Sequence, residues 1–137
     1  MTSKNAIVPR GIRNNNPLNI RIGNTWLGEV QKPTDKEFEQ FVTMPYGIRA
    51  GFVILRRYIR RYSKKTIKDI VSTWAPSNEN NTKAYIATVC KLMGMGENEE
   101  IKYEDSVTMC NLVAAMIKVE CGCEVPRKQI ELGYAIA

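Results

Sequence analysis

The sequence predicts a mainly α-helical protein, α+β at most, that forms one domain over residues 1–137. The length of 137 residues suits a single core of ordinary size. Hydrophobic residues make up 44% and charged residues 25%, which is typical of a globular chain and not of a disordered or fibrous one. After a polar start, apolar residues recur at helical spacing, which indicates about five helices.

The predicted helices are bounded by residues that favour helix ends. Thr66 is typical of a capped helix start, and Pro76 ends the same segment. Asn81 or Thr82 can cap the next helix, which stops at Gly94. The helices are expected over residues 46–62, 66–75, 82–93, 106–121 and a short segment that follows Pro126.

The start of the chain is predicted to be irregular, because residues 10–33 are rich in asparagine, glycine and proline. Short extended pieces are expected around Asn19–Ile22 and Phe38–Val42. Asn14, Asn15, Asn16 and Asn19 fall close together, and their amides offer donors and acceptors that could hold sugar hydroxyls and N-acetyl groups. The alternative is a turn in which these amides bond their own backbone.

Several kinds of chemistry are excluded by composition. Histidine is absent, which excludes Ser-His and Cys-His mechanisms and His-ligated metals. Only Cys121 and Cys123 are close in sequence, so the four cysteines lack the two close pairs of a zinc site. No metal or cofactor is therefore expected. Cys90 and Cys110 are expected in the core, and this cysteine usage suits a reducing folding compartment.

The charge of the chain is uneven. Its net charge is +6, with 14 Lys and Arg against 5 Asp and Glu in residues 1–75, and 6 against 9 in residues 76–137. A basic half favours an anionic partner, which is a nucleic acid, an acidic wall polymer or a membrane surface. No apolar run approaches the roughly 18 residues that cross a bilayer, so membrane insertion is not expected. Residues 1–9 lack the apolar core of a secretory signal.

Glu120 is the candidate acid. It follows Ile117 by three residues and Met116 by four, so it shares their face at the end of an apolar helix. A carboxylate that faces the core is costly unless it is paired or protonated. Desolvation and the helix C-terminus would both raise its pKa, as a general acid near neutral pH requires. The alternative is a partly exposed glutamate at a frayed helix end.

A second candidate segment is Glu79–Tyr85. Glu79 precedes the helix expected from residue 82, and Tyr85 lies one turn inside it. The plain interpretation gives Glu79 a favourable position near the helix N-terminus and Tyr85 a place in the core.

Motifs in order along residues 10–90 point to a known superfamily. They are Arg10–Arg21, Trp26-Leu27-Gly28, Phe38, Phe41, Gly47-Ile48-Arg49-Ala50, Trp74-Ala75-Pro76 and Glu79–Tyr85. In this order they resemble small phage and prophage proteins of the lysozyme-like superfamily, some of which are labelled virion structural proteins. The resemblance implies a lysozyme-like single domain with a loop-rich N-terminal segment.

Two wider resemblances suggest roles for single residues. Residues 16–21 and 26–28 are similar to the substrate loop of wall glucosaminidases. Residues 79–89 resemble the Glu-Thr-x-x-Tyr-Val segment of lytic transglycosylases with an extra asparagine, which implies that Tyr85 lies near the catalytic acid. The substrate contacts implied are Asn15, Asn16, Asn19, Trp26, Glu79 and Asn80.

The chain departs from the transglycosylase pattern in one respect. There the catalytic glutamate lies in a Glu-Ser-Gly type motif upstream of the other motifs, and this sequence has no glutamate before Asn14. The best match is Glu120-Cys121-Gly122, which implies a circularly permuted order with the catalytic helix last. The rival acids are Glu29, Glu39 and Glu79.

The sequence thus favours an enzyme that cleaves the glycan strand of peptidoglycan, with Glu120 and Tyr85 at its centre. A lytic transglycosylase is favoured over a muramidase because no convincing aspartate partner is found. We expect a chain made in the bacterial cytoplasm without a signal peptide that acts at the cell wall, alone or with other virion proteins. The alternative is a non-catalytic virion or wall-binding module. Nucleic-acid binding is least favoured, because the linker between the helices at 46–62 and 66–75 lacks the glycine of a helix-turn-helix.

Overall fold

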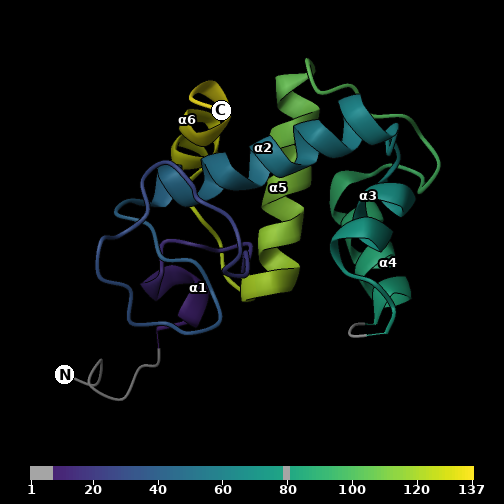
Figure 1. Cartoon of the computed structure of the whole chain (residues 1–137). Coiled ribbons are helices and arrows are strands. Elements are labelled where there is room, and N and C mark those ends of the chain that lie inside the picture. Colours follow the sequence, from purple (N-terminus) through teal and green to yellow (C-terminus); the bar gives the residue numbers. More distant parts are fainter. Residues whose placement is uncertain (1–7, 79–80) are drawn as a thin grey trace.

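The computed structural model describes residues 8–78 and 81–137. It is mainly α-helical, as predicted (Figure 1). The helices in the described part are α1 (Arg10–Arg13), α2 (Met44–Tyr62), α3 (Ile67–Trp74), α4 (Thr82–Met93), α5 (Ser106–Cys121) and α6 (Arg127–Ala135). The five helices predicted from the sequence correspond to α2–α6, and α1 is a single additional turn.

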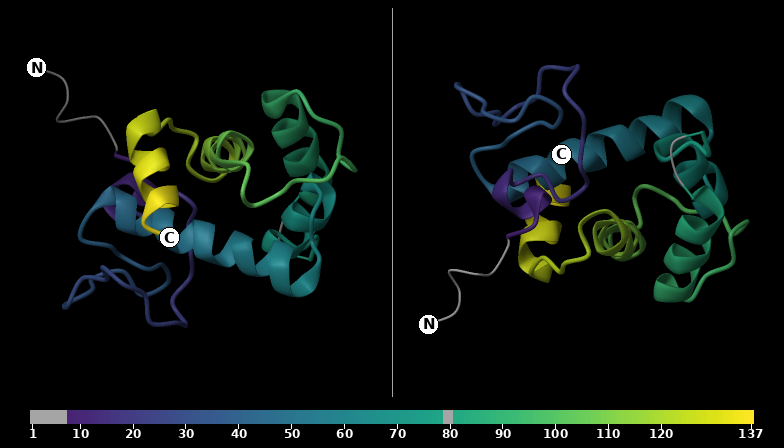
Figure 2. Two further views of the ribbon diagram at one scale, coloured as in Figure 1. Left: turned by 90° about the horizontal axis from the view of Figure 1, so that it is seen from above. Right: turned by 90° about the horizontal axis from the view of Figure 1, so that it is seen from below.

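The long helix α2 runs across the axis of α5, which the two views of Figure 2 show nearly end-on. One end of α2 lies beside α6 and the irregular N-terminal segment, and the other lies beside α3 and α4. Its buried face carries Ile48, Phe52, Leu55 and Ile59, which follow helical spacing. Helix α5 therefore lies in the middle of the fold, and its two ends have different neighbours.

The helices α2 and α6 approach each other closely at Gly133. A Cβ atom there would lie 2.6 Å from Cγ2 of Ile48, so a side chain could not fit without separating the helices. Next to it, the Tyr134 ring meets the Phe52 ring edge-on with centroids 5.3 Å apart. The Tyr134 hydroxyl donates to the main-chain oxygen of Tyr103 at 2.7 Å. This contact anchors the C-terminal helix to the core.

Side-chain caps begin three of the helices. Thr66, Asn81 and Asp105 accept hydrogen bonds from main-chain N–H groups two or three residues into α3, α4 and α5. Gly94 and Gly122 adopt left-handed conformations after α4 and α5, with φ of 65° and 69°. The predicted helix starts and stops are confirmed.

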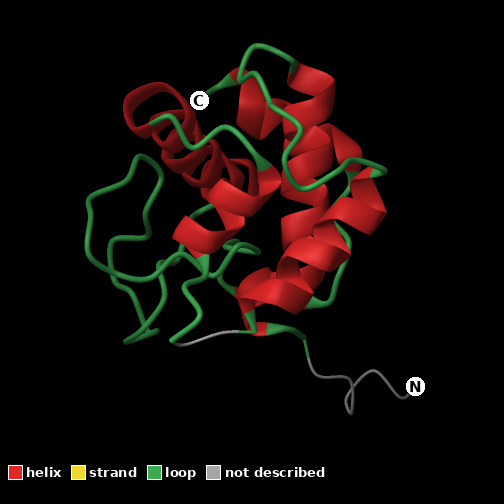
Figure 3. Ribbon diagram, turned by 90° about the vertical axis from the view of Figure 1, so that its right-hand side faces the viewer, coloured by secondary structure: helices red, strands yellow, loops and turns green. Residues whose placement is uncertain are grey.

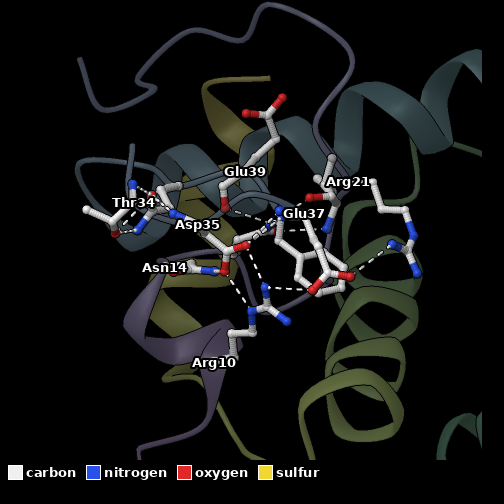
Figure 4. Close-up of polar contacts among 11 residues, drawn as sticks. Arg10, Asn14, Arg21, Thr34, Asp35, Glu37 and Glu39 are labelled. Carbon is white, nitrogen blue, oxygen red and sulfur yellow. Dashed lines mark hydrogen bonds and ion pairs between the residues drawn. The ribbon is translucent and has the colours of Figure 1, made fainter. Parts of the chain in front are cut away.

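The segment between α1 and α2 folds without regular strands, as the loops in Figure 3 show. Isolated antiparallel bridges join Arg21 to Phe38 and Glu29 to Phe41. The first bridge joins the two pieces that were expected to be extended, and the second pairs one of them with Glu29, which lies outside both. Arg10 binds the Asp35 carboxylate through two hydrogen bonds of 2.6 Å, and Asn14 donates to the same carboxylate (Figure 4). The Arg10 guanidinium also lies over the Phe38 ring. These contacts hold the two halves of the segment together.

The cysteines differ from the expectation in one pair. Cys121 and Cys123 form a disulfide with Cα atoms 5.2 Å apart, so the expectation that the cysteines stay reduced is wrong for this pair. One residue between two cysteines is too tight for a zinc knuckle, but it is enough to close a disulfide. Cys90 and Cys110 are free, and Cys110 is buried as predicted. In the part of the chain that the structure describes, no helix is long and apolar enough to cross a membrane.

Glu39 is an unusual buried carboxyl group. Its side chain is 7% exposed, and its Oε2 atom has no hydrogen-bond partner among the described residues. Burial, together with the neighbouring Glu29 carboxylate, raises the pKa of Glu39 from 4.5 to about 7. The folded protein therefore holds a proton on Glu39 at pH values where the unfolded chain does not.

We expect the free energy of unfolding to fall as the pH rises from 4.5 to about 7, because the folded state must then give up the Glu39 proton. Glu39→Gln keeps the group neutral and should stabilise the protein at pH 8 by about 1–3 kcal/mol, with little change at pH 4.5. Denaturant unfolding at both pH values measures this effect. Equal destabilisation of the variant at both pH values would contradict it.

Candidate functional site

Glu120 lies in the last turn of α5, at the end of that helix that meets α1 and the N-terminal segment (Figure 1). The helix ends there because Gly122 takes a left-handed conformation and its N–H bonds the main-chain oxygen of Lys118. Ile117 and Met116, on the same face, are fully buried. The carboxyl group is thus carried to the edge of the core, as its sequence position predicted.

Two side chains donate hydrogen bonds to the Glu120 carboxylate. Asn19 Nδ2 lies 3.4 Å from Oε1 and also 3.1 Å from the main-chain oxygen of Glu120. Trp74 Nε1 lies 3.2 Å from Oε2. Asn19 adopts a left-handed backbone conformation with φ of 54°, which asparagine tolerates better than most residues. The N-terminal segment, α3 and α5 thus meet at one carboxyl group.

Tyr85, from the first turn of α4, faces the same carboxylate. Its side chain is 6% exposed, and its hydroxyl is buried without a hydrogen bond of ordinary geometry. Burial raises the pKa of the Tyr85 hydroxyl, and the Glu120 charge raises it further. The hydroxyl therefore stays protonated and is available as a donor to a group that enters beside Glu120.

The groups around Glu120 have opposing effects on its pKa. Burial raises the pKa of Glu120 above its ordinary value, because the charged form loses hydration. The proximity of the Tyr85 hydroxyl, the hydrogen bonds from Asn19 and Trp74, and the charge of Arg21 lower the pKa, but burial prevails. The pKa of Glu120 thus lies nearer to neutral pH than the pKa of an exposed glutamate. Acid–base catalysis needs such a group because it must both give and take a proton.

Glu120 stands between two surface pockets. One, of about 310 Å³, is lined by Tyr85, Asn81, Thr88 and Val119 as well as Glu120. The other, of about 380 Å³, lies on the side of the N-terminal segment and includes Asn19, Arg21, Tyr58 and Trp74. Glu120 is the described residue that the two pockets share.

The structure separates the other predicted substrate contacts from this site. Asn16 is fully buried, and its amide bonds the main chain of Ile20 and Glu39 through three hydrogen bonds of 2.9–3.0 Å. Asn15 donates to the main-chain oxygen of Phe41. The alternative of a turn that bonds its own backbone therefore describes Asn16, whereas Asn15 bonds the main chain 26 residues away. Neither residue lines the two pockets beside Glu120.

Trp26 was expected to stack on a sugar face, but it is 9% exposed and belongs to the hydrophobic core. It lines neither of the two pockets beside Glu120. The rival acids Glu29 and Glu39 lie in the N-terminal segment and also line neither of these pockets. Glu79 and Asn80 fall outside the described residues, so nothing is said of their positions.

Trp74 and Arg21 are site residues that the sequence reasoning missed. The indole N–H of Trp74 reaches the Glu120 carboxylate, and Arg21 lines the pocket on the N-terminal side. The available signals were the motif Trp74-Ala75-Pro76 and the position of Arg21 at the end of residues 16–21, which resemble a substrate loop. Across residues 8–78 and 81–137, no cluster of three Cys, Asp or Glu side chains could hold a metal ion.

The fold and the site define a mainly α domain with a half-buried carboxyl group between two pockets, a candidate acid–base site. No known family profile matches the chain. A curated protein, Protein P5 of Pseudoalteromonas phage PM2, is 42% identical over 117 residues, which are 82% of this chain and 71% of that protein. The chain belongs to the same family as this phage protein, which supports a phage origin.

Trp74→Phe tests the hydrogen bond from the indole to Glu120. Loss of the N–H donor removes a contact that favours the charged form, so we expect the pKa of Glu120 to rise further. Titration of ¹³C-labelled glutamate carboxyl groups by NMR measures this change. Tyr62→Phe, at an exposed aromatic residue far along α2, is the matched control and should leave Glu120 unchanged. An unchanged or lower pKa in Trp74→Phe would show that the bond does not act on the carboxylate.

The disulfide directly after Glu120 gives a second prediction. Cys121→Ser with Cys123→Ser should lower the free energy of unfolding by about 1–2 kcal/mol, because the short closed loop no longer restricts the unfolded chain. Denaturant unfolding of the variant and of wild-type protein with and without reductant measures the difference. Reduced wild type should match the variant. Identical stability of oxidised and reduced wild type would argue against a contribution of the bond.

Proposed function

We propose that this protein cleaves the β-1,4 glycan strand of peptidoglycan, with Glu120 as the acid. The observation that carries the proposal is the Glu120 carboxyl group, partly buried, with a raised pKa, at the junction of two pockets. Glycosidases need a protonated carboxyl group beside the scissile oxygen and room for sugars on both sides of it. The resemblance of the sequence to the lysozyme-like superfamily supports the same assignment.

In the proposed reaction, Glu120 first gives its proton to the glycosidic oxygen, and the bond from that oxygen to C1 breaks. The 6-hydroxyl of the same sugar then attacks C1 and forms the 1,6-anhydro ring. Glu120, now a carboxylate, takes the hydroxyl proton and is restored to its acid form. The atoms balance without water or a cofactor.

A single acid favours the transglycosylase over the muramidase. Glu120 is the only carboxylate among the described residues that line the two pockets. Hydrolysis usually requires a second carboxylate to activate water or to attack the sugar, whereas intramolecular attack by the 6-hydroxyl does not. Tyr85 would donate a hydrogen bond near the reacting centre, and Asn19 would orient Glu120 and contact an N-acetyl group.

The family membership fits a phage-associated role. Phage proteins that act at the cell wall work as lysis enzymes or as parts of the particle, and other virion proteins would be partners in the second case. A non-catalytic virion or wall-binding module on the same scaffold is the competing function. The experiment below separates the two.

Purified peptidoglycan should release muropeptides that end in 1,6-anhydro sugars when digested with wild-type protein, and mass spectrometry identifies them. Glu120→Gln keeps the size of the side chain but removes the acid, so we expect the rate to fall by a factor of at least about 10². Glu124→Gln is the matched control, because this neighbour is exposed and pairs only with Lys118 at 4.0 Å. Its activity should equal that of wild type.

Each other outcome has a definite meaning. Reducing-end products would identify a hydrolase with a further carboxylate. Full activity in a folded Glu120→Gln variant would refute the assignment of the acid. Binding to the wall without any product would refute the enzymatic function and support the non-catalytic module.

A further inference from the structure

The two pockets beside Glu120 differ in charge. The pocket on the α4 side contains no cation among its described lining residues, whereas the pocket on the N-terminal side contains Arg21 as its only described cation. Apart from Glu120, the other described residues that line the second pocket are aromatic, aliphatic or amide side chains, among them Tyr58, Trp74 and Asn24. An asymmetric ligand with one anionic substituent would therefore be oriented with that substituent on the Arg21 side.

Arg21 is held in place but is not neutralised. Its main chain forms the antiparallel bridge with Phe38, and its guanidinium lies 5.1 Å from the centre of the Phe38 ring. Phe38 is in turn covered by Arg10, which Asp35 fixes through two short hydrogen bonds (Figure 4). The stacking orients the planar guanidinium without using its N–H groups as donors.

The carboxylate nearest to Arg21 is a weak competitor. Glu37 Oε2 lies 4.0 Å from Arg21 Nη1, and the two side chains are 65% and 59% exposed. Glu37 also accepts a hydrogen bond from Arg10 at 3.1 Å. An exposed pair at this distance contributes little, so a ligand carboxylate with bidentate geometry can displace it.

We propose that Arg21 binds a free carboxylate of the peptide attached to the muramyl residue, so that the protein selects glycan strands whose stem peptides carry free carboxylates over strands whose carboxylates are amidated. The inference rests on the proposed function, since it names a substrate group for the same pair of pockets. In peptidoglycan, the lactyl carboxyl group of muramic acid is joined to the peptide as an amide, so the free carboxylates of the intact repeat lie on the peptide. Arg21 is thereby the specificity-determining residue on one side of Glu120.

The first experiment compares two substrates that share one glycan. One consists of strands with intact stem peptides, and the other of the same strands with the peptide carboxylates converted to carboxamides. We expect wild-type protein to prefer the strands with free carboxylates about tenfold in kcat/KM. Arg21→Gln should lose this preference, so that its kcat/KM is the same for both substrates. Arg21→Lys keeps the positive charge but not the planar guanidinium and should show an intermediate preference. Arg57→Gln, at an exposed arginine of α2 outside both pockets, is the control.

A second experiment measures binding without cleavage. N-acetylmuramyl-dipeptide with a free carboxylate is titrated against its carboxamide analogue, and the fluorescence of Trp74 in the pocket wall reports occupancy. The carboxylate should bind about tenfold more tightly to wild type and equally to Arg21→Gln. Equal binding of the two ligands to wild type would overturn the inference.

The two experiments keep the inference and the proposed function apart. Cleavage of both strand types at the same rate, unaffected by Arg21→Gln, would refute the role of Arg21 and leave the glycan-cleaving function intact. Absence of cleavage together with Arg21-dependent binding of the carboxylate would refute the enzymatic function and support the carboxylate site.

Discussion

The hydrogen bonds between Asn19 and Glu120 join parts of the chain that lie 101 residues apart, and the candidate site depends on this junction. Because Asn19 binds both the main-chain oxygen and the carboxylate of Glu120, it fixes the end of α5 against the N-terminal segment. That segment in turn keeps its shape through the buried amide of Asn16 and through the Arg10–Asp35 pair. The Glu120 carboxyl group is therefore positioned by a loop whose own order comes from polar contacts and not from strands or helices.

The same junction explains the unequal surroundings of the carboxyl group. On one side lie the donors Asn19 and Trp74, which favour its charged form. On the other side lies the buried hydroxyl of Tyr85, whose hydrogen-bonding capacity is unused by ordinary partners among the described residues. A buried donor without a partner costs free energy in the folded state, and a ligand that accepts its hydrogen bond recovers that cost on binding. Such a site is poised for a polar ligand that enters next to the acid.

Local signals in the sequence were sufficient for the helices and for the orientation of Glu120. The caps at Asp105 and Gly122 and the spacing from Ile117 to Glu120 depend on neighbours within one or two turns, and periodicity records such neighbours. The roles of the asparagines could not be separated in the same way. Asn16 and Asn19 are three residues apart and of one type, yet one amide is consumed by the backbone and the other reaches α5. That difference is decided by tertiary contacts, as are the burial of Trp26 and the approach of Trp74 to Glu120.

The Cys121–Cys123 bond has a consequence for when the site is completed. Thiol-reducing systems in the cytoplasm keep cysteine pairs open, whereas the periplasm and particle surfaces allow disulfides to persist. If the protein acts at the cell wall as proposed, it passes from the first environment to the second. On that route the Cys121–Cys123 bond beside the last turn of α5 would close after the chain has left the cytoplasm, and completion of the surroundings of Glu120 would be a separate event from synthesis of the chain.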